Sequence, residues 1–259
     1  MAEALISGLN IPAHALVTGA SSGIGLAVVE QLLARADVAQ VLAVSRSAPH
    51  NAQLAALQAT HGERLRLLAA DLTVDADLAA LTTRVREHTG ALHLVFNAAG
   101  LLHAPGLRPE KSVTQLRRDA LAQVFAVNAF APILLAQALL PLMRHGQPAV
   151  LASLSARVGS IGDNRLGGWY AYRASKAAHN QLLRTLGIEL RRTHPQVTCV
   201  LLHPGTVDTP LSKPFQLNVP AEKLFGPQHA ARQLLAVIAS MTPARSGSFL
   251  AWDGETIPW

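Results

Sequence analysis

The chain has 259 residues, of which 50% are hydrophobic and 15% charged, and its formal net charge is +6 at pH 7. This composition excludes a disordered chain, and the length can bury the core of one large α/β domain. The single cysteine, Cys199, excludes an internal disulfide and fits a reducing compartment. Because the basic residues are scattered and not interleaved with aromatic ones, we expect no nucleic-acid partner.

The first half of the chain alternates short apolar strands with helical patterns. The predicted strands cover residues 14–20, 40–47, 63–72 and 92–100. The predicted helices between them cover residues 23–36, 51–62 and 75–90. Two long helical segments follow, Val113–Phe125 and Asn128–Met143.

The second half continues with a strand at 148–155, a helix at Tyr170–Thr193, a strand at 196–205, a helix at 227–240 and a short last strand within 246–254. Strands separated by such helices imply crossover connections and a parallel sheet covered on both faces. We expect an α/β fold, a single doubly wound Rossmann domain over residues 1–259 with a mostly parallel sheet of about seven strands. Residues 13–150 would form a cofactor half, and residues 151–259 a catalytic and substrate half.

The N-terminus, MAEALISGLNIPAH, lacks a basic region followed by a long apolar core, so we expect no signal peptide. No uninterrupted apolar run approaches the roughly 18 residues of a membrane span. We therefore expect a cytoplasmic protein without a membrane partner.

A glycine-rich turn, TGASSGIG, lies between the first strand and the first helix. Glycine there allows a tight turn, close approach to a phosphate, and close packing of helix on strand. The following helix N-terminus offers free N–H groups and a positive dipole end to a pyrophosphate. The predicted dinucleotide contacts are Thr18, Gly19, Ser21, Ser22, Gly23, Ile24 and Gly25.

The end of the second strand, VLAVSRSAP, carries no acid that could bind the ribose hydroxyls of NAD. Ser45 and Arg46 stand there instead, and an arginine fork suits a 2′-phosphate. These residues predict that NADP(H) is preferred over NAD(H). The alternative is that Arg46 is a solvated surface residue.

Tyr172 and Lys176 are four residues apart, so their side chains share one face of the predicted helix. A lysine cation, together with the charge of a nicotinamide, favours the phenolate and should lower the tyrosine pKa from about 10. The alternative for Tyr172 is a packing residue at the helix entry. Tyr170 is followed four residues later by Ala174, so it cannot form such a pair, and we expect Tyr170 and Trp169 to line a substrate mouth.

The motifs T-G-x-x-x-G-x-G, N-A-A-G, Y-x-x-x-K and H-P-G-T-V-D-T occur in this order, and together they resemble the short-chain dehydrogenase/reductase family over nearly the whole chain. The resemblance implies an NAD(P)-dependent oxidoreductase that reduces a ketone, aldehyde or quinone to an alcohol. It implies that Tyr172 donates the proton and that Lys176 also binds the nicotinamide ribose. Further cofactor contacts that it implies are Asp71, Leu72, Asn97, Ala98, Ala99, Gly100, Pro204, Gly205, Val207 and Thr209.

The same resemblance implies a serine at the end of the fifth strand and an asparagine relay. We assign the serine to Ser155, with Ser153 and Ser160 as alternatives; the register is ambiguous by one residue and puts Ala156 at the commonest family position. Asn128 would help to hold a water that links the lysine to solvent, or it would cap a helix kink before Pro132. The histidines are not spaced as metal ligands, and we predict no metal.

The long segment between serine and tyrosine and the ending WDGETIPW resemble the C-factor-like subgroup, which is similar to sniffer-type carbonyl reductases. This implies a mainly NADPH-linked carbonyl reductase with a small-molecule carbonyl substrate. The alternative is an NAD(P)-binding signalling or redox-sensing protein with little turnover. The segment 210–226 falls where the family keeps a mobile substrate lid, and the family's helix pairing implies a homo-oligomer, a dimer or tetramer.

Overall fold

The computed structural model describes residues 4–217 and 219–259. Its main sheet has seven strands in the order β3-β2-β1-β4-β5-β6-β9, and every pair in it is parallel. The strands are β1 (Ala13–Thr18), β2 (Val38–Ser45), β3 (Leu65–Ala69), β4 (Leu94–Asn97), β5 (Ala149–Leu154), β6 (Val197–His203) and β9 (Ser248–Ala251). The predicted α/β fold with about seven strands is confirmed.

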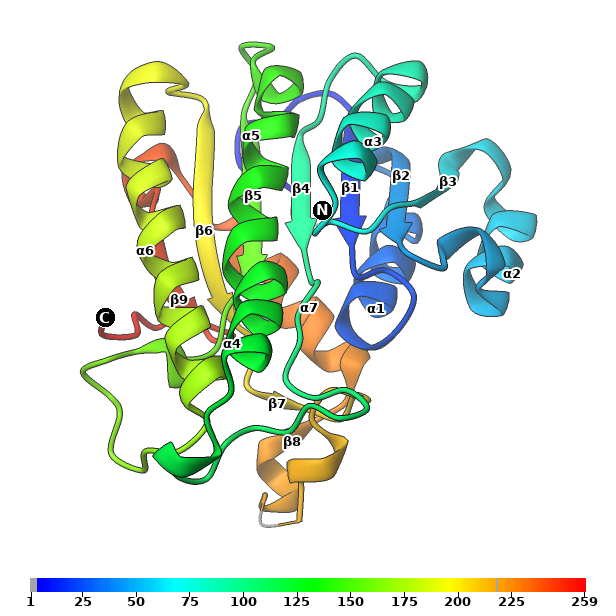
Figure 1. Cartoon of the computed structure of the whole chain (residues 1–259). Helices are drawn as coiled ribbons and strands as arrows, with labels where there is room; N and C mark the ends of the chain where they lie inside the picture. The colour runs from blue at the N-terminus through cyan, green and yellow to red at the C-terminus, as the bar shows by residue number, and fades with distance from the viewer. Residues whose placement is uncertain (1–3, 218) are drawn as a thin grey trace.

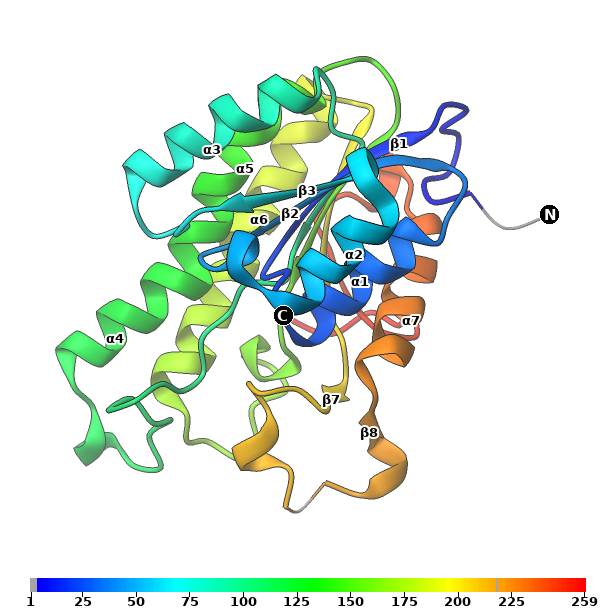
Figure 2. The same ribbon diagram turned by 90° about the vertical axis from the view of Figure 1, so that its right-hand side faces the viewer.

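Helices cover both faces of this sheet (Figures 1 and 2). One face carries α1 (Gly23–Leu33), α2 (Ala52–His61) and α7 (Pro227–Ala239). The other carries α3 (Asp75–His88), α5 (Ala131–Met143) and α6 (Tyr170–Thr193), with α4 (Arg118–Phe125) extending beyond the sheet. Because successive strand side chains alternate between faces, Leu16 and Val17 of β1 belong to two separate cores, and the strands are apolar on both sides.

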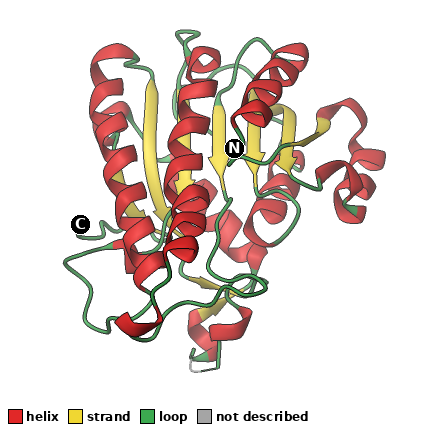
Figure 3. Cartoon of the chain, in the orientation of Figure 1, coloured by secondary structure: helices red, strands yellow, loops and turns green. Residues whose placement is uncertain are grey.

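The strand order reverses between β1 and β4. From β1 the chain runs outward to β2 and β3, and then returns to β4 on the opposite side. This divergence leaves a crevice at the carboxyl ends of the strands, where open α/β sheets bind their ligands. In Figures 1 and 3 the strands point downward, and long loops and the short pair β7 (Thr206–Val207) and β8 (Leu224–Phe225) gather below that edge.

The two long helical segments predicted after β4 differ from the structure. Residues Val113–Gln115 form a separate 3-10 turn, and α4 begins only at Arg118. A π-helical turn at Ala126–Phe130 then joins α4 to α5 without a break. Pro132 has no N–H to donate to the carbonyl of Asn128, which favours a widened turn there.

The continuous run Arg118–Met143 is long and apolar enough to cross a membrane by length and composition. The sequence analysis missed this because it divided the run into two helices. In the structure Leu135, Leu139 and Met143 of the run are buried in the core against the sheet. One face of the run therefore packs in the core of the fold, whereas Phe130 and Leu134 are exposed.

Candidate active site

A cavity of about 1350 Å³ opens at the carboxyl edge of the sheet. Its walls come from the glycine-rich turn, the ends of β2 and β3, the segment after β4, the start of α6 and the segment after β6. It collects most of the predicted cofactor residues: Gly19, Ser21, Ser22, Gly23, Ile24, Gly25, Ser45, Arg46, Asp71, Leu72, Ala98, Ala99, Gly100, Pro204 and Thr209. Thr18, Asn97, Gly205 and Val207 are not among the residues that line it.

Thr18 and Asn97 lie beneath the cavity floor in a buried chain of hydrogen bonds. Thr18 Oγ1 donates to Asn97 Oδ1 (2.5 Å), and Asn97 Nδ2 donates to Ser153 Oγ (2.8 Å). Ser153 Oγ lies 2.9 Å from Nε2 of His179. The chain therefore ties β1, β4 and β5 to α6, so these side chains support the site and do not line the cavity.

His179 is a residue of this site that the sequence analysis did not assign to it, naming the histidines only as not spaced for a metal. It is fully buried on α6, three residues after Lys176, and burial holds its pKa well below the usual range, so the ring is neutral. Its position three residues after Lys176 could have indicated this role, because residues three and four apart share a helix face. Among residues 4–217 and 219–259, no group of three or more His, Cys, Asp or Glu side chains is placed to hold a metal.

The glycine-rich turn forms a cradle that side chains would fill. Gly19 has φ of 64°, and a Cβ on it would lie 2.8 Å from the carbonyl carbon of Ala98. A Cβ on Gly25 would lie 2.2 Å from the carbonyl oxygen of Gly19. The start of α1 thus packs directly on the turn, and no acidic side chain in its first turn opposes its positive end. These features fit the pyrophosphate of a dinucleotide.

At the ends of β2 and β3, Arg46 is exposed at the cavity beside Asp71. Hydrogen bonds from Thr73, with a smaller contribution from the Arg46 charge, lower the pKa of Asp71. Asp71 is the only acidic residue that lines the cavity in the described part of the chain. The sequence analysis expected no acid at the end of β2, and no carboxylate there lines the cavity among the described residues.

Tyr172 and Lys176 are both buried on α6 and line the cavity. Lys176 Nζ lies 5.9 Å from the centroid of the Tyr172 ring and donates to the carbonyl oxygen of Leu154 (2.9 Å). Burial raises the pKa of Tyr172 to about 12 and lowers the pKa of Lys176 to about 8. In the protein without cofactor, burial raises the pKa of Tyr172, while the Lys176 ammonium is directed at a carbonyl. The expected lowering of this pKa, which included the charge of a bound nicotinamide, stays a prediction.

Ser155 lines the cavity, and its Oγ donates to Oδ1 of Asn180 (2.6 Å). The two alternative serines have other partners. Ser153 belongs to the buried chain, and Ser160 Oγ accepts from the backbone N–H of Asp163 (3.1 Å). Of the three serines, only Ser155 lines the cavity. Asn180, which the sequence analysis did not single out, accepts the one proton that Ser155 can donate.

Asn128 is buried in the π-helical turn. Its Oδ1 accepts from the N–H of Leu101, and its Nδ2 donates to the Leu101 carbonyl, both at 2.7 Å. Nδ2 also donates to Ser175 Oγ (3.1 Å). A Cβ on Gly100 would lie 3.7 Å from Asn128 Oδ1 and 4.0 Å from Lys176 Nζ, so the asparagine lies beneath the lysine end of the cavity.

Apolar side chains line the part of the cavity formed by segment 210–226. Leu211 and Phe215 of segment 210–226 line it, and the ring centroids of Phe215 and Trp169 are 4.9 Å apart. Trp169 also packs edge-on against Tyr172 at 6.2 Å. The expectation that Trp169 and Tyr170 line the mouth is wrong, because neither is among the lining residues: Trp169 stands behind Phe215 and Tyr172, and Tyr170 is 41% exposed.

The chain is similar to known proteins in both sequence and fold. The sequence profile described as short chain dehydrogenase matches residues 13–219. The C-signal of Myxococcus xanthus is 37% identical over 140 residues, which cover 54% of this chain and 78% of that protein. The fold is similar to NADPH-bound carbonyl reductase from chicken fatty liver (TM-score 0.84, 30% identity), covering 97% of this chain and 100% of that one. It is also similar to the carbonyl reductase Sniffer of D. melanogaster (TM-score 0.84, 26% identity, 96% and 100% covered).

Proposed function

The chain belongs to the short-chain dehydrogenase/reductase family, and we propose that it uses NADPH to reduce a ketone, aldehyde or quinone to an alcohol. The observation that carries this proposal is the pair Tyr172 and Lys176, buried on one wall of the cavity that also contains the glycine cradle. Bound NADPH would supply the hydride that the carbonyl carbon accepts. The solved carbonyl reductases of similar fold support the same reaction class.

Arg46 supports NADPH as the preferred cofactor. Its guanidinium is exposed at the cavity and would pair with a 2′-phosphate, while no lining carboxylate at the end of β2 would repel that group. The relative from chicken fatty liver was solved with NADPH bound, which agrees with this preference.

Tyr172 is the proposed proton donor. With its pKa near 12 it is protonated at neutral pH, so it can donate to the substrate carbonyl oxygen as negative charge develops there. Lys176, with a pKa near 8, is mostly cationic at pH 7 and would stabilise the resulting phenolate.

Ser155 and Asn128 have supporting roles in this proposal. Ser155 would donate a hydrogen bond to the carbonyl oxygen. This requires its hydroxyl to rotate away from Oδ1 of Asn180, which accepts its proton in the structure. Asn128 would help to hold a water that returns a proton towards Lys176, although the oxygen and the nitrogen of its side-chain amide also bind the Leu101 backbone. One side chain can therefore hold the backbone next to the site and take part in a relay.

The test is cofactor oxidation by the purified protein with a panel of ketones, aldehydes and quinones, comparing NADPH with NADH. We expect turnover of at least one carbonyl class, with NADPH giving the higher kcat/KM. Binding of NADPH without oxidation by any carbonyl, including the carboxylate-bearing ones described below, would contradict the proposed reaction.

A second candidate is a signalling or redox-sensing protein that binds NAD(P) with little turnover. The similarity to C-signal is the observation that favours it. The panel separates the two candidates, because a sensor would bind NADPH tightly and oxidise it negligibly with every substrate.

We also propose that the protein is a homo-oligomer. Phe130 at the end of the π-helical turn, Leu134 of α5 and Ile188 of α6 are 51%, 37% and 53% exposed, and α5 and α6 cover the same face of the sheet. Burial of these side chains against a second copy would remove apolar surface from water and so stabilise a symmetric assembly. Light scattering after gel filtration tests this, and a monomeric mass would contradict it.

A further inference from the structure

The substrate end of the cavity carries two cations, Arg108 and Lys111. Four Lys or Arg residues line the cavity: Arg46, Arg108, Lys111 and Lys176. Arg46 stands by Asp71 at the β2 and β3 side, and Lys176 is directed at Leu154. Arg108 and Lys111 lie in the segment after β4, and both are exposed at the rim.

Glu110, between these two cations, holds them at the start of the catalytic helix. Its carboxylate Oε2 accepts the N–H of Ala171 (3.1 Å), and its carbonyl oxygen accepts the N–H of Trp169 (2.5 Å). Ala171 immediately precedes Tyr172, so residues 108–111 are fastened within one helical turn of the proposed proton donor. Trp169 has φ of 52°, a conformation costly for a bulky residue, and these bonds help to hold it.

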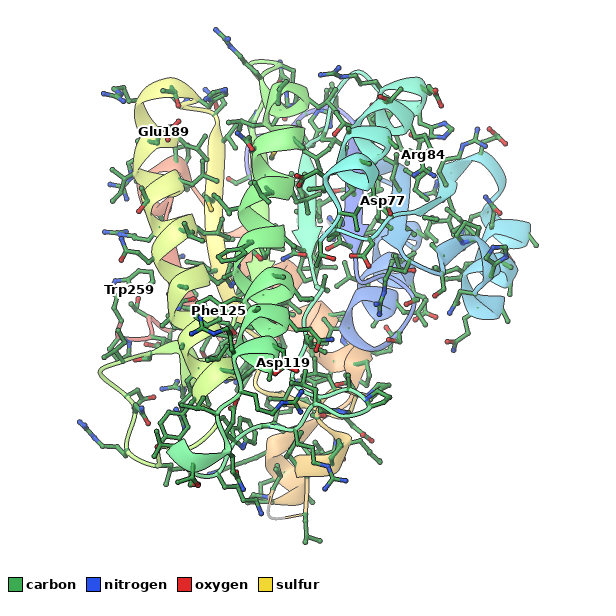
Figure 4. The ribbon with its side chains drawn as sticks, viewed as in Figure 1. Asp77, Arg84, Asp119, Phe125, Glu189 and Trp259 are labelled. Atoms are coloured by element: carbon green, nitrogen blue, oxygen red, sulfur yellow. The ribbon has the colours of Figure 1, made fainter. Side chains whose placement is uncertain are left out.

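Neither cation is neutralised by a carboxylate in the described part of the chain. Two other cations near this end have carboxylate partners: Lys213 pairs with Asp208 at 3.2 Å, and Arg117 pairs with Asp119, which is labelled in Figure 4. The side chains of Arg108 and Lys111 have no hydrogen-bond or ion-pair partner within residues 4–217 and 219–259.

The acid nearest to these cations in sequence, Glu110, is buried, and its carboxylate serves the N-terminus of α6. The positive end of the helix dipole already offsets that negative charge. Arg108 and Lys111 therefore border the cavity as exposed cations beside the start of α6, and they also line a smaller neighbouring pocket. Asp71, the one acid among the described lining residues, lies at the ends of β2 and β3.

We infer that Arg108 and Lys111 form a subsite for a carboxylate, and that the substrates are carbonyl compounds with an apolar body and a carboxylate remote from the reacting carbonyl. The body would contact lining side chains such as Leu107, Leu211 and Phe215. An arginine fork and a lysine cation suit a carboxylate, and an open positive patch attracts anions over a Debye length. This inference rests on the proposed function, since it assigns the substrate class of the same site.

The test compares 4-formylbenzoate and 3-(4-formylphenyl)propanoate with their methyl esters, which keep the aldehyde and remove the charge. With NADPH we expect kcat/KM for one or both acids to exceed that of the matching ester by about tenfold, mainly through KM. Added salt should reduce the preference, because the cations are exposed. The double variant Arg108→Ala/Lys111→Ala should lose the preference and keep the ester rate, whereas Arg165→Ala, an exposed arginine outside the cavity lining, should keep both.

Calorimetric titration of the matching alcohols, as acids and esters, into the NADPH-loaded protein gives a readout that does not need turnover, because neither the alcohol nor NADPH can accept a hydride. Tighter binding of the acid, lost in the double variant, supports the subsite even if no aldehyde is reduced, and then only the proposed reaction fails. Equal kcat/KM and equal binding for acid and ester would overturn the subsite and leave the reductase intact. A preference that survives the double variant would also overturn it.

Discussion

The cofactor end of the cavity is formed mainly by backbone, and the substrate end mainly by side chains. At the cofactor end, glycines 19, 23 and 25 line the cavity where α1 begins, and Arg46 is the cation at this end among the described lining residues. At the substrate end, side chains from three separate segments meet: residues 101–111, the start of α6, and segment 210–226.

The difference explains what each end can recognise. Backbone groups in a tight turn bind a phosphate in the same way whatever the neighbouring side chains are, so the cofactor end is general. Side chains that meet only in the folded chain decide shape and charge, so the substrate end is particular to this protein. The following experiments test that division, beginning with the group that lies between the two ends.

Tyr172→Phe should lower kcat by about 10²–10⁴-fold, because it removes the proton donor, and it should leave NADPH binding within about twofold. Stopped-flow oxidation and fluorescence titration measure the two effects. The matched control is Tyr170→Phe, at an exposed residue outside the cavity lining, which should retain wild-type rates. Unchanged kcat in Tyr172→Phe would exclude this tyrosine as the donor.

Ser155→Ala should lower kcat by about 10²-fold, because one donor to the developing oxyanion is lost. Ser160→Ala, at a buried serine that binds only the neighbouring loop, serves as control. The variant Ala156→Ser tests the one-residue ambiguity in register. If Ser155→Ala is silent while Ala156→Ser raises kcat, the carbonyl contact belongs to position 156.

Gly19→Ala should weaken NADPH binding by about 10²-fold, because the new Cβ meets the Ala98 backbone and displaces the cradle. Gly146→Ala is its control, since Gly146 also has positive φ (78°) but nothing within 4 Å of a Cβ. The pair separates backbone strain from loss of the cradle. Similar Kd values for NADPH in the two variants would show that the cradle does not form the phosphate site.

Arg46→Ala should lower kcat/KM with NADPH by about tenfold and leave the value with NADH unchanged, because only NADPH has the 2′-phosphate. Arg86→Ala, an exposed arginine of α3 away from the cavity, should change neither value. An equal loss with both cofactors would show that Arg46 acts on the fold or the shared phosphates.

The pH dependence has the smallest expected effect. Since Lys176 has a pKa near 8 and is cationic below it, kcat/KM for reduction should fall about fivefold between pH 8 and pH 9. Tyr172 keeps its proton in this range and His179 stays neutral, so neither obscures the fall. In Lys176→Arg the cation persists and the fall should disappear, even if the rate is lower. A flat wild-type profile to pH 10 would contradict a role for the Lys176 charge.

The fold was largely predictable, and the errors in it have local causes. The apolar strands and intervening helices predicted the parallel sheet because burial on both faces requires continuous hydrophobic runs. The π-helical turn at Ala126–Phe130 was missed because Asn128 and Pro132 together suggested a break, whereas the structure only widens the helix. The pair β7 and β8 was missed because its strands have two residues each, too short for any periodicity.

The sequence alone determined the family, the glycine cradle, the absence of an acid after β2 and the pairing of Tyr172 with Lys176. All of these lie within short stretches whose spacing sets their geometry. Tertiary structure decided what depends on distant segments: the burial that sets the pKa of Tyr172, the chain from Thr18 to His179, and the Glu110 contact that brings Arg108 and Lys111 to the start of α6. No local pattern encodes these contacts, because each joins residues more than twenty positions apart or reflects exclusion of water by the whole fold.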